Sequence, residues 1–308
     1  MRRPLPIPPA YLVRDPSVSV LRAALGLTLY LDDPMHWARE GAVASLRSFL
    51  AHAPAAGERW FTTSAMASWE PLTDATLARI EEALTLPWGR RAPRHLLHVR
   101  LADDTGAPTL GWQYREIDDG RPGAGVGWLQ IVLPEAHPAD DLLALAIELG
   151  QEHPFVAGVG GYLGVINPSE SPTAFQLLRA WCRRYLGLDA QHPDTAARYA
   201  QRALPGTNWI TMLGPTLRSA LPPGADLAAP WSEPVAVIPL SRGALLRAGE
   251  SPTLGDVNTL TAPAAYAEVA HRLATLLPAS PPELPHWDAD AKETAAWMRR
   301  FVEPEVWS

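Results

Sequence analysis

The chain has 308 residues, of which 47% are hydrophobic and 19% are charged, a composition typical of globular rather than disordered proteins. Its formal net charge of −7 argues against a nucleic-acid-binding protein, because such proteins present a basic face to the phosphate backbone. The single cysteine, Cys182, cannot form an internal disulfide, so nothing ties the fold to an oxidising compartment.

The N-terminal region predicts an extended arm followed by a core strand. Residues 1–17 are rich in proline and lack the apolar core of a signal peptide. Residues 18–31 are apolar but too short to cross a membrane, and Arg22 interrupts them. The sequence therefore predicts a cytoplasmic protein without a membrane partner.

Helical spacing of apolar residues predicts helices over residues 35–52 and 73–86, and Thr73 is placed to cap the second. Three strand-like runs follow, separated by Asp- and Gly-rich turns, which is typical of an antiparallel meander. These runs are residues 94–101, 110–117 and 126–133. The remaining pattern predicts helices over 140–152, 173–186, 195–203, 263–277 and 288–302, and strands over 155–166, 207–213, 235–238 and 244–247.

Strands and helices are grouped rather than strictly alternating, which predicts an α+β fold with a largely antiparallel sheet flanked by helices. The two strand-rich blocks, residues 94–133 and 207–248, leave open an arrangement of two similar lobes. We expect three parts along the chain: an arm over 1–17, a single α+β domain over 18–278, and a linker with a C-terminal helix over 279–308. That last helix would cap the fold or reach a partner.

Motifs that carry chemistry are missing from the sequence. It contains no Gly-x-Ser-x-Gly elbow, Walker loop, dinucleotide fingerprint or His-Glu-x-x-His zinc motif, so we expect no catalytic residue, cofactor or metal. Glu148, Glu152 and His153 could ligate a metal near a helix end, although a solvated helix end explains them better. Asp256 could form a carboxylate–amide site with Asn258, but such side chains more often hold a turn.

Three segments carry a family resemblance. Residues 208–214 include Asn208, Trp209 and Gly214; residues 248–258 include Gly249, Gly255, Asp256 and Asn258; and residues 181–189 end in Tyr-Leu-Gly-Leu-Asp. They resemble signature stretches of the DUF3396 family, except that Leu186 stands where the family usually has proline. We expect these signature residues to be structural.

The family is associated with immunity proteins of type VI secretion. The resemblance therefore implies a non-enzyme that binds a cognate effector toxin of the nuclease type and occludes its active site. Two other functions stay open: an adaptor or chaperone that loads an effector, and an enzyme of another type acting through Asp256, Glu250 or the Glu148–His153 group. Homodimerisation is also left open, and nucleic acid is not expected as a partner.

A toxin-binding surface is then the first site to seek. Acidic residues near the hairpin ends could imitate phosphate toward a basic toxin cleft, although solvated turns explain them as well. These residues are Asp103, Asp104, Glu116, Asp118 and Asp119. Tryptophan is favoured at interfaces, and Trp69, Trp112, Trp128 and Trp287 lie near loops or strand ends, although core packing is an equal explanation.

Overall fold

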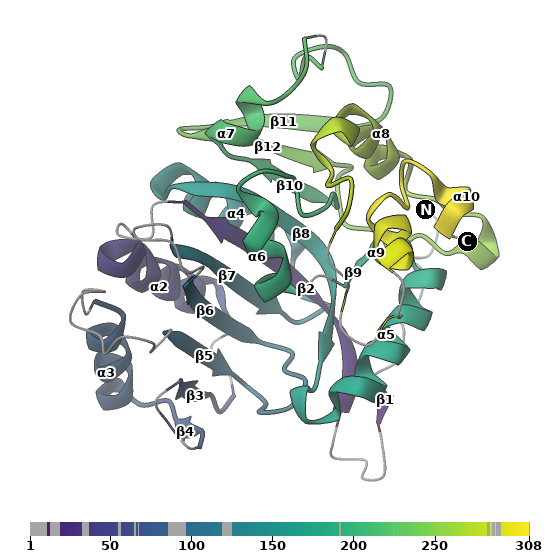
Figure 1. The fold of residues 1–308 in the computed structure, drawn as a ribbon. Coiled ribbons are helices and arrows are strands. Elements are labelled where there is room, and N and C mark those ends of the chain that lie inside the picture. Colours follow the sequence, from purple (N-terminus) through teal and green to yellow (C-terminus); the bar gives the residue numbers. More distant parts are fainter. Residues whose placement is uncertain are drawn as a thin grey trace.

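A computed structural model describes residues 11–12, 19–32, 37–54, 57–64, 66, 68–85, 97–118, 125–190, 192–223, 225–281, 284, 287 and 291–307. Within these residues, twelve strands form one sheet, with β11 at one end and β4 at the other (Figure 1). The strand order is β11-β12-β10-β8-β2-β7-β6-β5-β3-β4, while β1 also pairs with β2 and β9 with β8. All the pairings are antiparallel except that of β8 with β9, so the predicted α+β class is confirmed.

The strands are β1 (Tyr11–Leu12), β2 (Ser19–Leu31), β3 (Trp60–Thr63), β4 (Glu70–Pro71), β5 (His98–Ala102), β6 (Gly111–Asp118), β7 (Gly125–Leu133), β8 (Phe155–Ile166), β9 (Leu188–Asp189), β10 (Ile210–Leu213), β11 (Val235–Leu240) and β12 (Gly243–Ala248). The central pair is β2 and β8, which match from Leu21 opposite Ile166 to Leu31 opposite Phe155. This pair joins the two strand-rich blocks of the sequence into one sheet. Two separate lobes are therefore not formed.

The helices are α2 (Ala42–His52), α3 (Asp74–Thr85), α4 (Ala139–Glu152), α5 (Ser171–Arg184), α6 (Pro193–Ala200), α7 (Pro215–Ser219), α8 (Ala264–Arg272), α9 (Ala291–Met298) and α10 (Pro304–Trp307). Shorter turns are η1 (Trp37–Gly41), η3 (Pro168–Glu170), η4 (Val257–Thr259) and η5 (Ala274–Leu276). Several predicted helices are therefore shorter than expected; the one predicted over 288–302, for example, ends as α9 at Met298. Residues 37–41 form a π-helical turn before α2, and Pro263–Leu277 divides into α8 and η5.

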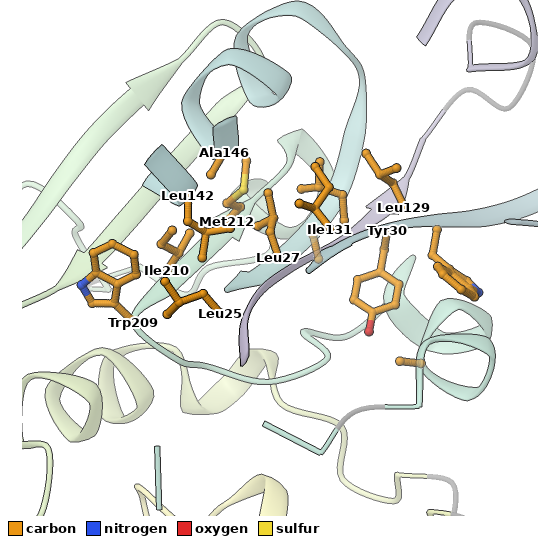
Figure 2. Packing of buried hydrophobic residues seen from close by; sticks show 14 of the residues in the cluster. Leu25, Leu27, Tyr30, Leu129, Ile131, Leu142, Ala146, Trp209, Ile210 and Met212 are labelled. Carbon is orange, nitrogen blue, oxygen red and sulfur yellow. The ribbon is translucent and has the colours of Figure 1, made fainter. Parts of the chain in front are cut away.

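Helix α4 covers one face of the central strands. Figure 2 shows Leu27, Ile131 and Met212 gathered beside Leu142 and Ala146 of this helix, whereas Tyr30 points to the other side of the sheet. Helix α2 packs against α4 and α3 and contacts β6, so all three helices share this apolar face. Helix α6 contacts β2 and β7 on the side of Tyr30. Side chains alternate along a strand, so the residues between those that contact α2 and α4 lie on the opposite face of the sheet.

The C-terminal segment packs onto the core. Arg300 is only 2% exposed and donates from Nε to the Leu186 carbonyl at 2.7 Å and from Nη1 to the Trp297 carbonyl at 3.0 Å. Trp307 donates from Nε1 to the Cys182 carbonyl at 3.1 Å. Of the predicted linker, residues 282, 283, 285 and 286 lie outside the described part, as does most of the predicted N-terminal arm.

Candidate functional site

Two rows of polar side chains cross the meander on the face opposite α2. The register of β5, β6 and β7 places His98 opposite Arg115 and Arg115 opposite Trp128. The next row runs from Arg100 through Gln113 and Gln130 to Thr28 of β2. Cross-strand partners share a face of the sheet, so these rows form one continuous polar surface.

This surface is the floor of a cleft of about 330 Å³. Helix α5 and the start of α6 form its wall, with apolar groups from α5 and β8 facing polar groups from the meander. The lining includes Phe175, Leu178, Leu163, Val165, His192, Asp194 and the row residues His98, Arg100, Gln113, Arg115, Trp128 and Gln130. A concave site with an apolar wall and a few convergent polar groups is the usual form of a binding site.

Asp194 fixes the wall to the floor. It lies in the first turn of α6 and accepts a 2.8 Å hydrogen bond from Nε1 of Trp128 through Oδ1. Its Oδ2 lies 2.9 Å from Nη1 of Arg115, which forms an ion pair. A single carboxylate therefore neutralises one cleft arginine and orients the indole of Trp128, which is only 4% exposed.

The cleft histidines stay neutral near pH 7. Burial, together with the positive charges of Arg115 and Arg100, lowers the pKa of His98 to about 4. Its Nε2 lies 3.4 Å from Gln113 Oε1, and its ring meets Trp128 edge-on at a centroid distance of 5.7 Å. Burial also lowers the pKa of His192.

Arg100 is the cleft cation for which the described residues supply no counter-charge. Its guanidinium lies 4.8 Å from the ring centroid of Trp69, a residue of the segment between β3 and β4. In the part of the chain that the structure describes, no hydrogen bond or ion pair links this guanidinium to another residue. Burial lowers the pKa of Arg100, because the half-buried cation has lost part of its hydration.

The acidic residues predicted to meet a toxin are engaged in their own loop. Asp103 accepts hydrogen bonds from the backbone N–H groups of Thr109 and Leu110, each at 3.0 Å, and from the Thr109 hydroxyl. Asp104 accepts from the Gly106 N–H at 2.8 Å and lies 3.7 Å from Nη2 of Arg22. Both carboxylates thus stabilise the turn between β5 and β6, and a toxin contact for them stays a prediction.

The other predicted contact residues differ in accessibility. Trp112 is fully buried and donates to Ser45 of α2 at 3.3 Å, and Glu116 is 3% exposed and accepts from the Tyr114 hydroxyl at 3.0 Å. Both lie on the helix-covered face, which removes them from the surface of the free protein. Trp128 is nearly buried, and it lines the cleft. Asp118 lies in β6 with its side chain undescribed, and Asp119 lies outside the described residues.

The three signature segments bond to one another. Asn208 is fully buried and donates from Nδ2 to the Gly187 carbonyl at 3.2 Å, which links the first segment to the third. Trp209 donates from Nε1 to the Gly249 carbonyl at 3.2 Å, which links the first to the second. At Gly214 a β-carbon would stand 2.2 Å from the Phe155 carbonyl oxygen, so only glycine fits where β10 ends beside β8.

Asp256 and its neighbours build a braced loop. Asp256 is 3% exposed, accepts from the Asn258 N–H at 3.0 Å, and pairs with Nη2 of Arg184 at 3.0 Å. Two backbone hydrogen bonds also join it to Thr261. Gly255 has a φ of 59° and Gly249 a φ of 88°, left-handed values that favour glycine. The geometry of Asp256 is that of a turn-holding residue.

The alternative metal and enzyme groups do not converge. Glu148 accepts a hydrogen bond from the Ser48 hydroxyl at 2.5 Å, while the ring of His153 packs 5.1 Å from that of Trp37. Among the described residues, no group of three or more His, Cys, Asp and Glu could hold a metal ion. Burial raises the pKa of the Cys182 thiol, which suits a packing role rather than a nucleophile.

His98, Arg100, Gln113 and Arg115 were not predicted from the sequence as a site. Their signal is the alternation itself, since each strand of the meander places polar residues two apart. That pattern defines a polar face, but the antiparallel register is needed to align the rows of three strands.

Comparison with known proteins identifies the family. Residues 44–301 match the TsiV family, described as type VI immunity for VRR-NUC. The chain belongs to this family of immunity proteins. It is an immunity protein of type VI secretion, as the resemblance implied, although the match does not carry the DUF3396 label.

A solved structure supports the fold of this TsiV-family chain. The Pseudomonas aeruginosa T6SS protein PA0821 superposes with a TM-score of 0.76 at 17% identity, covering 94% of this chain and 86% of that one. No curated protein matches the sequence. Among the described helices, none is long and apolar enough to cross a membrane.

Proposed function

We propose that this TsiV-family protein neutralises a cognate type VI effector nuclease by binding it as a folded inhibitor and occluding its active site. The observation that supports this is the family match over residues 44–301, which spans most of the sheet. On this proposal the protein acts in the cytoplasm, without catalysis, before the effector reaches its substrate. We also propose membership of DUF3396, on the three signature segments.

The architecture suits an inhibitor that is already folded before it meets its target. One core cluster extends from Leu21 to Trp307 and includes residues of the sheet and of the C-terminal helices. A preformed surface loses little conformational entropy on binding, which favours tight complexes. Toxin–inhibitor complexes can reach Kd values of about 10⁻¹³ M. We expect a complex with a cognate effector that is far tighter than micromolar.

The test is growth rescue combined with isolation of the complex. A type VI effector nuclease from the same genome would be expressed in a sensitive host with and without this chain. Rescue, together with a stoichiometric complex of defined mass, is the expected result. Binding without rescue would assign the protein as an adaptor instead. The absence of both binding and rescue would refute the proposal that the protein neutralises the effector. The complex mass also tests whether the protein forms a homodimer, which the sequence left open.

A further inference from the structure

The cleft between the meander and helices α5 and α6 has features that point to one kind of occupant. We propose that it receives an acidic loop of the effector, and that Arg100 pairs with a carboxylate of that loop. This inference rests on the proposed function and specifies which surface carries it. It concerns residues on the side of the sheet opposite α2, not the acidic turn at Asp103.

Within the described residues, Arg100 has no carboxylate partner of the kind that a half-buried cation requires. Removing a guanidinium from water is costly unless a carboxylate or a set of acceptors replaces the lost hydration. The Cζ of Arg100 lies over the Trp69 ring at 4.8 Å from the centroid, a cation–π contact that uses none of the guanidinium N–H groups. A carboxylate can accept two of these N–H groups at once, which is the strongest arrangement open to arginine.

The net charge of the cleft favours an anion. Asp194 neutralises Arg115, and burial keeps His98 and His192 uncharged near pH 7. The charge of Arg100 therefore dominates the described lining, although the whole chain carries −7. A local positive site on an acidic protein orients an incoming acidic group toward this face.

The chemistry of the lining favours a protein loop over a phosphate. Phe175, Leu178 and Leu163 supply an apolar wall that suits the aliphatic part of a peptide segment. A nucleic-acid strand would meet the net negative charge of the chain over most of its length. A volume of about 330 Å³ suits a few side chains of one loop.

The test uses charge variants of the full chain and an effector made non-toxic by a single substitution. Arg100→Gln removes the charge and keeps a polar side chain, and Arg100→Glu reverses the charge. Arg242→Glu is the matched control, because Arg242 is exposed in the turn between β11 and β12 near the opposite end of the sheet. Circular dichroism and thermal unfolding show first that each variant folds.

We expect Arg100→Gln to weaken effector binding by at least roughly 30-fold, the effect of truncating one member of a buried charge pair. Arg100→Glu should weaken it further and abolish growth rescue, while Arg242→Glu should stay within about threefold of the wild-type protein. An arginine introduced at one Asp or Glu of the effector should restore binding to Arg100→Glu.

Each other outcome has a definite meaning. If the wild-type chain neither binds nor rescues, the proposed function fails, and the inference that rests on it fails too. If the wild-type chain binds and rescues but both folded Arg100 variants bind as tightly as Arg242→Glu, the effector does not use this cleft and the inference is wrong. Arg100-dependent binding of a single-stranded oligonucleotide, with effector binding unchanged, would assign the cleft to nucleic acid and also overturn it.

Discussion

Asp256 shows how a conspicuous acidic residue serves the fold. The hydrogen bond from Arg184, followed by that from the Asn258 N–H, lowers the pKa of this carboxylate. We predict that Asp256→Ala stays folded, rescues growth, and loses about 1 kcal/mol of stability, because a turn-holding hydrogen bond is removed. Urea unfolding at pH 7 and the rescue assay measure the two effects.

The matched control for this prediction is Glu250→Ala, which removes an exposed acidic residue six positions earlier. It should leave stability unchanged within about 0.5 kcal/mol. Since the folded pKa of Asp256 is depressed, its contribution is present above the unfolded value of about 3.9 and is lost as the pH falls through the folded pKa. A folded Asp256→Ala protein that fails to rescue would contradict the structural role.

His98 yields a pH prediction. Its folded pKa of about 4 lies below the unfolded value of 6.5, so the unfolded chain binds the proton first as the pH falls. The stability associated with neutral His98 is therefore full above pH 6.5 and is lost progressively toward pH 4. We predict that His98→Gln loses less stability than the wild-type protein between pH 7 and pH 4.5, measured by urea unfolding. Equal losses, or protonation of His98 near pH 6.5 by NMR, would contradict this.

At the scale of elements, the packing of the C-terminal segment, residues 291–307, against the core depends on one buried arginine. Arg300 donates to the carbonyls of Leu186 and Trp297, and its guanidinium lies 4.4 Å from the rings of Trp297 and Phe301. We predict that Arg300→Ala costs about 3 kcal/mol or more, because buried acceptors lose their donor and a cavity remains. Thermal or urea unfolding measures the loss.

The neighbouring arginine supplies the control. Arg299 forms an ion pair with Glu303 one turn later, and both side chains are about one-third exposed. Exposed pairs of this kind contribute roughly 0.3–0.5 kcal/mol, so Arg299→Ala should change stability by less than about 1 kcal/mol. Similar losses of stability in both variants would mean that the burial of Arg300 does not stabilise the packing of residues 291–307 against the core.

The periodicity of apolar residues predicted most helices and strands, but it did not show which face of the sheet the helices cover. Strand β8 has the predicted bounds, and Thr73 accepts from the Thr76 N–H at 3.2 Å at the start of α3, as its capping role requires. The short strands β3 and β4 were missed because two to four residues carry too little alternation. Trp112 and Arg115 lie three apart in β6 and so face opposite sides, but only tertiary packing decides which side α2 covers.

At the scale of the whole molecule, the site depends on contacts between distant segments. The cleft takes its floor from residues 98–130 and its wall from residues 163–194, so neither half of the chain contains it. The same holds for the signature segments, which meet only once β8, β10 and the C-terminal part are in place. Sequence resemblance could therefore indicate a type VI immunity protein without locating a binding surface, since its strongest signals mark residues that join parts of the fold.

A sheet continuous through β2 and β8 should unfold as one unit. Leu27 lies at the centre of β2, is 1% exposed, and packs between the two strand-rich blocks. We predict that far-UV circular dichroism and tryptophan fluorescence give superimposable urea transitions, and that Leu27→Ala shifts both together by about 2–5 kcal/mol. Leu260→Ala, at a position 92% exposed, is the matched control and should shift neither. Two separated transitions, or a shift confined to one probe, would show instead that the two blocks unfold independently although β2 and β8 join them in one sheet.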